Sequence, residues 1–80
     1  MNPCPWDEID AFQGLNEFQR FERWMAEQVT SNVAEEVPVN QRYAGATTFH
    51  ERWFKHKSSG MVWRLVNPDP PFAGTFEPIK

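Results

Sequence analysis

The chain has 80 residues, a formal net charge of −3, 15% aromatic residues and one cysteine, Cys4. This length predicts a single small domain over residues 1–80, and one cysteine excludes a disulfide framework within the chain, so we expect a cytoplasmic protein. No apolar run approaches the ~20 residues of a membrane helix, and the first residues lack the basic start of a signal peptide, so we expect a soluble protein.

The charge is unevenly distributed along the chain. Residues 1–40 carry eight acidic and two basic residues, a net charge of −6, whereas residues 41–80 carry six basic and three acidic residues, a net charge of +3. This asymmetry indicates either an electrostatic contact between a helix and a sheet or a cationic face for a partner. A solvated surface that carries both signs is the simpler alternative.

The N-terminal segment, residues 1–14, is expected to contain a short helix. Pro5 suits the first position of a helical turn, and the helix dipole favours the acidic residues that follow it. Gly14 is the natural break at the end of this segment.

The main helical region is expected over residues 15–36, because apolar residues recur there at helical spacing. Asn16 can cap this helix, with Gln19 three residues later completing a capping box. Two endings stay open, since the helix either stops near Thr30 or continues into a short turn that Asn32 caps. The expected apolar face comprises Leu15, Phe18, Phe21, Met25, Ala26 and Val29, with Trp24 at its edge.

Residues 47–77 are expected to form a β-hairpin followed by a C-terminal edge strand. A three-residue turn, Ser58-Ser59-Gly60, with Gly60 in the left-handed conformation pairs Lys57 with Met61. This register gathers most of the large apolar side chains on one face, toward the helix. These side chains are Phe49, Trp53, Met61, Trp63 and Leu65.

Together these elements predict an α+β domain. One main amphipathic helix, after a short N-terminal helical turn, is expected to pack on a small antiparallel sheet of two to three strands.

No motif in the sequence predicts catalysis, a cofactor or a metal. His50 and His56 are six residues apart, about 20 Å along a strand, which is too far for one metal ion. Cys4 lies near acidic side chains, which do not favour a reactive thiolate. A phosphate-binding glycine loop and a nucleophile elbow are both missing from the sequence. We therefore expect no enzyme activity, no cofactor and no metal site.

The hairpin face turned away from the helix is the predicted partner-binding surface. It combines an aromatic ring with arginines, the residue types that supply much of the binding energy at protein interfaces. Its predicted partner-binding residues are Arg52, Phe54, Arg64, His50 and His56. The predicted function is that of a non-catalytic protein-binding module, such as an adaptor, an assembly factor or an inhibitor of a larger protein or complex, with no membrane partner.

Three alternatives stay open at this stage. Single-stranded RNA or DNA binding is the alternative function, with bases stacked on Phe54 or Trp53 and basic side chains near phosphate, although the acidic total charge argues against it. The second alternative is that Phe54 does not bind a partner and is instead part of a second core layer. The acidic helix, through Glu17, Glu27, Glu35 and Glu36, is an alternative interface for a basic partner.

Overall fold

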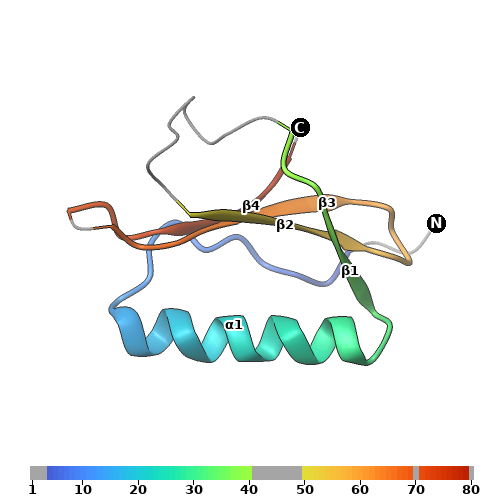
Figure 1. Ribbon diagram of the computed structural model, residues 1–80, viewed down its shortest axis with the longest axis horizontal. Helices are drawn as coiled ribbons and strands as arrows, with labels where there is room; N and C mark the ends of the chain where they lie inside the picture. Colours follow the sequence, from blue (N-terminus) through green and yellow to red (C-terminus); the bar gives the residue numbers. More distant parts are fainter. Residues whose placement is uncertain (1–3, 41–49, 70, 80) are drawn as a thin grey trace.

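A computed structural model describes residues 4–40, 50–69 and 71–79. One helix is followed by four strands: α1 (Leu15–Thr30), β1 (Ala34–Val37), β2 (Glu51–His56), β3 (Val62–Val66) and β4 (Thr75–Pro78). The strands form one antiparallel sheet in the order β1-β2-β3-β4, and α1 covers one face of it (Figure 1). The α+β class is confirmed, but the sheet has four strands and not the two to three predicted.

The N-terminal segment, residues 4–14, is extended rather than helical, so the short helix predicted there is wrong. Ile9 pairs with Phe76 of β4 through two backbone hydrogen bonds of 2.8 and 2.9 Å. The segment thus runs along the helix side of the sheet (Figure 1). This path places Trp6 and Phe12 in the hydrophobic core, a gain in apolar burial that one isolated helical turn does not provide.

The start of α1 lacks the predicted capping box. Gly14 is at the N-cap position, so no side chain caps there, and Asn16 and Gln19 are exposed within the helix. Glu17 instead reaches back, and its Oε1 accepts a hydrogen bond from the Gln13 backbone N–H at 3.2 Å. The helix begins too early for Asn16 to cap it.

The end of α1 at Thr30 agrees with one of the two predicted endings. Asn32 has a φ of 66°, and its N–H donates to the Val29 carbonyl at 3.1 Å, while the Val33 N–H donates to the Gln28 carbonyl at 2.9 Å. This pair of bonds is a Schellman motif, in which a left-handed residue closes the helix. Asn32 therefore terminates α1 and does not start a further turn.

Strand β1 follows this turn, so the helical region predicted over residues 15–36 is helical only as far as Thr30, and its last residues form a strand instead. Ala34 lies opposite His56 of β2, and the Lys57 N–H donates to the Val33 carbonyl at 3.0 Å. Glu35 and Glu36 are unfavourable beside the negative end of a helix, whereas in β1 both side chains are exposed and Ala34 is buried.

The β2–β3 hairpin has a four-residue turn, and its register differs by one residue from the prediction. The His56 N–H donates to the Met61 carbonyl and the Gly60 N–H donates to the His56 carbonyl, both at 2.8 Å. Gly60 has a φ of 76°, the left-handed conformation expected for it. The side chain of Ser59 stabilises this larger turn, because its Oγ lies 2.8 Å from His56 Nδ1 and accepts the Met61 N–H at 3.2 Å.

The shifted register changes which side chains face the helix. Phe54 now lies opposite Trp63, and both are in the core with Leu65, whereas Trp53 lies opposite Arg64 on the other face. Met61, predicted to be buried, is 40% exposed. Phe49, the remaining member of the predicted face, lies outside the described residues.

The hydrophobic core lies between α1, the N-terminal segment and the sheet. Trp63 and Phe76 stack with their ring centroids 4.7 Å apart, and Phe12 packs edge-on against Phe18 at 5.1 Å. The core comprises Trp6, Phe12, Phe18, Met25, Ala34, Phe54, Trp63, Leu65 and Phe76.

Candidate partner-binding groove

The five predicted partner-binding residues do not share a face. Phe54 and His56 lie on the helix side of the sheet and are 2% and 4% exposed. Arg52 is exposed at the margin of that side, Arg64 lies on the opposite face, and His50 precedes β2 in an exposed position. The predicted outer face is wrong in its membership, because the one-residue shift in register exchanges the two faces of β2 relative to β3.

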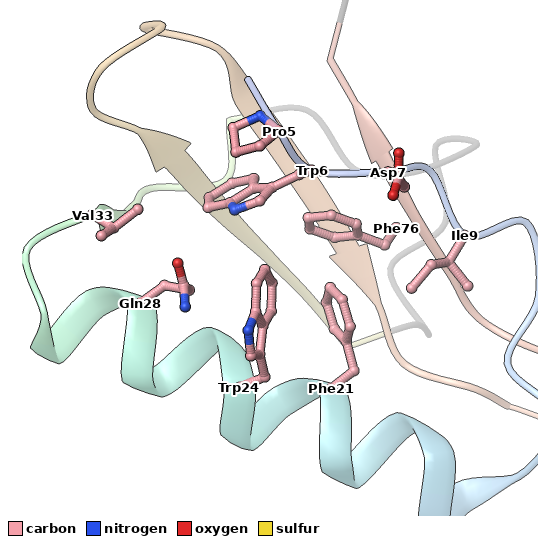
Figure 2. A pocket seen from close by; sticks show the side chains of 9 residues that line it. All are labelled: Pro5, Trp6, Asp7, Ile9, Phe21, Trp24, Gln28, Val33 and Phe76. Atoms are coloured by element: carbon pink, nitrogen blue, oxygen red, sulfur yellow. The ribbon is translucent and has the colours of Figure 1, made fainter. Parts of the chain in front are cut away.

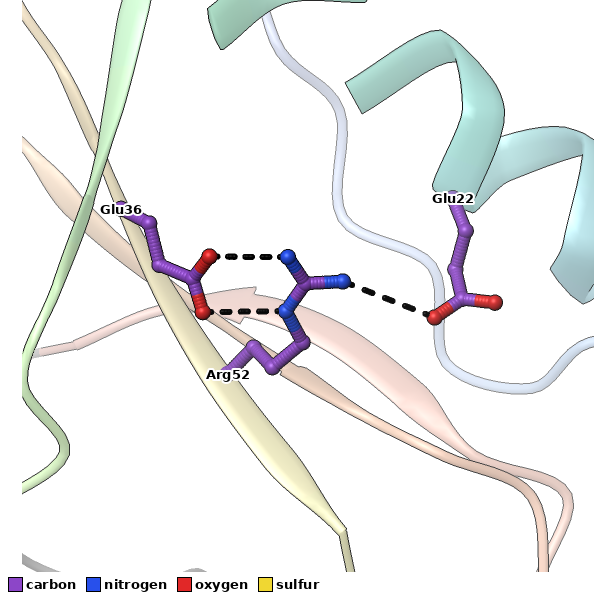
Figure 3. Close-up of polar contacts among 3 residues, drawn as sticks. All are labelled: Glu22, Glu36 and Arg52. Carbon is purple, nitrogen blue, oxygen red and sulfur yellow. Dashed lines mark hydrogen bonds and ion pairs between the residues drawn. The ribbon is translucent and has the colours of Figure 1, made fainter. Parts of the chain in front are cut away.

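Arg52 joins three elements of the fold (Figure 3). Its Nε and Nη2 atoms donate to the two carboxylate oxygens of Glu36 on β1 at 3.0 and 2.8 Å, and its Nη1 lies 3.8 Å from Glu22 Oε2 on α1. The hydrogen bonds with Arg52 hold the pKa of the Glu36 carboxyl below its usual value of 4.5, and the same bonds raise the pKa of the Arg52 guanidinium. Arg52 is thus already committed to contacts within the protein.

The substitution Glu36→Gln is expected to lower the free energy of unfolding by about 0.5–1 kcal/mol at neutral pH, the size usual for a partly exposed ion pair. Because folding lowers the pKa of the Glu36 carboxyl, its contribution is complete above the unfolded-state pKa of about 4.5 and is lost as the pH falls through the folded-state pKa. Urea unfolding at neutral and at strongly acidic pH measures this difference.

The matched control is Glu35→Gln, which removes an exposed carboxylate from the neighbouring position of β1. It is expected to change stability by less than about 0.5 kcal/mol at either pH. A deficit of Glu36→Gln that persisted or grew in acid would contradict the stabilising role of this carboxylate.

Arg64 is held on the opposite face by Glu51 and Trp53. Its Nε lies 3.2 Å from Glu51 Oε2, and the side chain of this glutamate is 1% exposed. The same oxygen accepts a hydrogen bond from Trp53 Nε1 at 2.6 Å. Reversing the charge of Arg64 would place two carboxylates together in a buried setting, so this substitution tests stability as much as binding.

A groove lies between the N-terminal segment and the C-terminal half of α1 (Figure 2), and we call it the aromatic groove. Phe21, Trp24 and Gln28 project into it from α1, because residues three and four positions apart lie on the same side of a helix. Its volume is about 450 Å³. The described lining residues are Pro5, Trp6, Asp7, Ile9, Phe21, Trp24, Gln28, Val33 and Phe76.

Four aromatic rings form the body of the aromatic groove. Trp24 contacts Trp6 edge-on, with the centroids 6.3 Å apart and the planes at 70°, and contacts Phe21 at 5.5 Å. Phe76 completes the set, at 4.7 Å from Phe21 and 5.9 Å from Trp6. Trp6 and Phe76 are buried, whereas Trp24 and Val33 are 40% and 38% exposed. The groove therefore has a buried aromatic floor and an exposed apolar wall.

A second apolar groove, of about 440 Å³, lies at the other end of α1. It is lined by Phe12, Gln13, Gly14, Leu15, Pro68, Pro71, Phe72 and Ala73, and Leu15 is 61% exposed. No charged side chain is among these described lining residues, which distinguishes it from the aromatic groove, where Asp7 contributes a carboxylate.

The sequence prediction missed the aromatic groove but contained one signal for it. Trp24 is predicted at the edge of the apolar face of α1, and a large ring at that position is only partly buried by the core. The opposite wall was missed because residues 4–14 were expected to be helical, whereas they are extended and pair with β4.

In residues 4–40, 50–69 and 71–79, no three His, Cys, Asp or Glu side chains are grouped so that they can hold a metal ion. The one helix of these residues is too short and too polar to cross a membrane. Comparison of the chain with protein-family models, with curated proteins and with solved structures gives no match.

Proposed function

We propose that this chain is a non-catalytic protein-binding module whose docking surface is the aromatic groove. The observation that carries this proposal is the exposure of Trp24 and Val33 beside the buried rings of Trp6 and Phe76. A partly exposed Trp next to a preformed concavity is typical of the anchors that dominate protein interfaces. An adaptor, an assembly factor or an inhibitor would use such a surface to hold a larger protein.

In this proposal an apolar side chain on a segment of the partner protein fills part of the aromatic groove. Such a side chain would cover Trp24 and Val33, and removing their apolar surface from water stabilises the complex. The amide of Gln28 and the carboxylate of Asp7 lie at the groove and would provide polar contacts around the apolar centre. Asp7 is the one titratable side chain among the described lining residues. Acid–base catalysis usually needs more than one such group, so this lining favours a binding role.

Single-stranded nucleic-acid binding by the hairpin has less support from these contacts. It needs exposed rings for base stacking and basic side chains that are available to phosphate. Phe54 and Trp53 are buried, and Arg52 and Arg64 each lie beside a carboxylate of the protein itself. A salt titration of binding to a short oligonucleotide separates the two functions, because phosphate contacts weaken steeply with salt.

The substitution Trp24→Ala tests the protein-binding proposal. Immobilised wild-type protein and variants are exposed to a lysate of the source organism, captured proteins are identified by mass spectrometry, and direct binding is then measured with the purified candidate. Trp24→Ala is expected to weaken that direct binding by more than about tenfold, the effect of losing one interface hot spot.

The matched control is Leu15→Ala, which removes another exposed apolar side chain from the same helix. It is expected to bind the partner as the wild type does. Equal binding by wild type and Trp24→Ala, with a loss in Leu15→Ala, would move the interface to the second groove and overturn the proposed surface. Near-ultraviolet circular dichroism confirms that both variants are folded.

A further inference from the structure

We propose that the aromatic groove recognises a cationic side chain, the Lys or Arg of a partner protein, which lies against the aromatic rings and pairs with Asp7. This inference rests on the proposed function and specifies the chemistry of the partner. An apolar residue beside the cation would fill the rest of the groove.

Arg52 is held by an aromatic ring and a carboxylate together. The guanidinium carbon lies 5.2 Å from the centroid of the Phe54 ring, and the same guanidinium forms two hydrogen bonds with Glu36. A cation within about 6 Å of a ring centroid is attracted by the negative face of the ring. One ring and one carboxylate therefore share one cation.

Arg64 repeats this arrangement on the opposite face of the sheet. Its guanidinium carbon lies 5.8 Å from the centroid of the Trp53 ring, and its Nε lies 3.2 Å from Glu51 Oε2. The protein thus combines an aromatic ring, a carboxylate and a guanidinium at two separate places, with residues from different strands.

The aromatic groove contains two of these three components. Trp24 presents a partly exposed indole, the aromatic system that attracts cations most strongly, and Asp7 presents a carboxylate. Figure 2 shows Trp24 rising from α1 and Asp7 on the N-terminal segment, with the Phe76 ring between them and Trp6 above Trp24. Among the described lining residues none is Lys or Arg, so no cation of the groove itself occupies this role.

Asp7 is the one charged side chain among the described lining residues, and the two elements that form the groove carry a net negative charge. Residues 4–14 contain three acidic residues, Asp7, Glu8 and Asp10, and no basic one. Helix α1 contains three acidic and two basic residues. Lys57 lies near the Val33 end, where its Nζ donates to Asn32 Oδ1 at 2.9 Å. A concave site that contains one carboxylate and lies between elements of net negative charge attracts cations and disfavours acidic segments.

Two small probes test this inference directly: n-butylguanidinium, which reproduces an arginine side chain, and n-butylurea, which has the same length and a planar head but no charge. Each is titrated into ¹⁵N-labelled protein at constant ionic strength, and the indole N–H resonance of Trp6 is followed. We expect saturable shifts at millimolar concentration and a Kd for n-butylguanidinium about fivefold lower than that for n-butylurea.

Three variants locate the preference for charge. Asp7→Asn and Trp24→Leu are each expected to remove most of the fivefold difference, the first by removing the carboxylate and the second by replacing the indole with an aliphatic side chain. Glu8→Gln, which neutralises an exposed neighbour outside the groove lining, is the control and is expected to retain the difference.

The outcomes separate this inference from the proposed function. Equal Kd values for the two probes, or an equal effect of Glu8→Gln and Asp7→Asn, would overturn the cation site while leaving an apolar docking groove in place. The lack of any shift with either probe would overturn it as well. The proposed function fails separately, when Trp24→Ala binds a purified partner as tightly as the wild type does.

Discussion

Replacing Phe54 with Ala is expected to lower the free energy of unfolding by about 3–5 kcal/mol. The Phe54 ring is 2% exposed and belongs to the core between the sheet and α1. Removing the ring loses the free energy of its burial and also leaves a cavity, which adds a second unfavourable term. For a chain of this length, whose total stability is expected to be about 4–12 kcal/mol, this loss lowers the melting temperature by roughly 12–40 °C.

The control for this prediction is Met61→Ala. Met61 is 40% exposed, and its truncation is expected to cost less than about 1 kcal/mol. The register predicted from the sequence gives the reverse order when its outer face meets solvent, because it buries Met61 and turns Phe54 away from the helix. Urea unfolding of both variants therefore tests the register, and an equal or larger loss in Met61→Ala would contradict it. If Phe54→Ala does not fold, Phe54→Leu replaces it in this comparison, with a smaller expected loss of unfolding free energy.

The second large effect is expected for Gly74→Ala. Gly74 has a φ of +83°, and a Cβ added there would lie 2.9 Å from the Val66 carbonyl oxygen, 3.1 Å from Phe12 Cδ2 and 3.1 Å from Pro68 Cδ. The left-handed conformation costs about 1–2 kcal/mol for alanine, and the overpacking adds about 1–3 kcal/mol. We therefore expect a total loss of about 2–5 kcal/mol in unfolding experiments.

Gly60→Ala is a closely matched control. Gly60 has a similar φ of +76°, but a Cβ added there meets no atom within 4 Å. Its expected cost is that of the backbone conformation alone, about 1–2 kcal/mol. The difference between the two variants measures the close approach of the N-terminal segment and the β3–β4 connection to Gly74. Equal losses would show that this approach is looser than described.

The fold class and α1 were predictable because they depend on local periodicity. Phe18 and Met25, seven residues apart, are both buried, and helical spacing alone places them on one face. Gly60 was predictable for a similar reason, since a hairpin turn that ends on Gly requires a left-handed residue there.

The register of the hairpin was not predictable from its pattern. The choice of register assumed that one face of the hairpin is buried and the other faces solvent. Both Phe54 and Trp53 are buried, on opposite faces, so the alternation of apolar and polar residues carries little information. The strand β1 escaped prediction because Ala34–Val37 contains two adjacent glutamates and pairs with β2 through its backbone.

The aromatic groove was not predictable because its walls come from distant parts of the sequence. Trp6, Trp24 and Phe76 belong to three different segments, and no local pattern indicates that they meet. Trp24 alone gave a signal, as an aromatic residue at the margin of an apolar helix face. The chemistry of a site assembled in this way depends on tertiary pairing, here the two hydrogen bonds between Ile9 and Phe76.

The pairing of Ile9 with Phe76 has a consequence for synthesis of the protein in the cell. A ribosome makes residue 9 long before residue 76, so the N-terminal segment has no strand to pair with until β4 has emerged. Closing this contact also encloses most of the chain in one loop, which slows folding relative to a purely local contact. The aromatic groove, which includes Phe76, therefore cannot form before β4 has been made, and a partner of the proposed kind would find the groove only after that point.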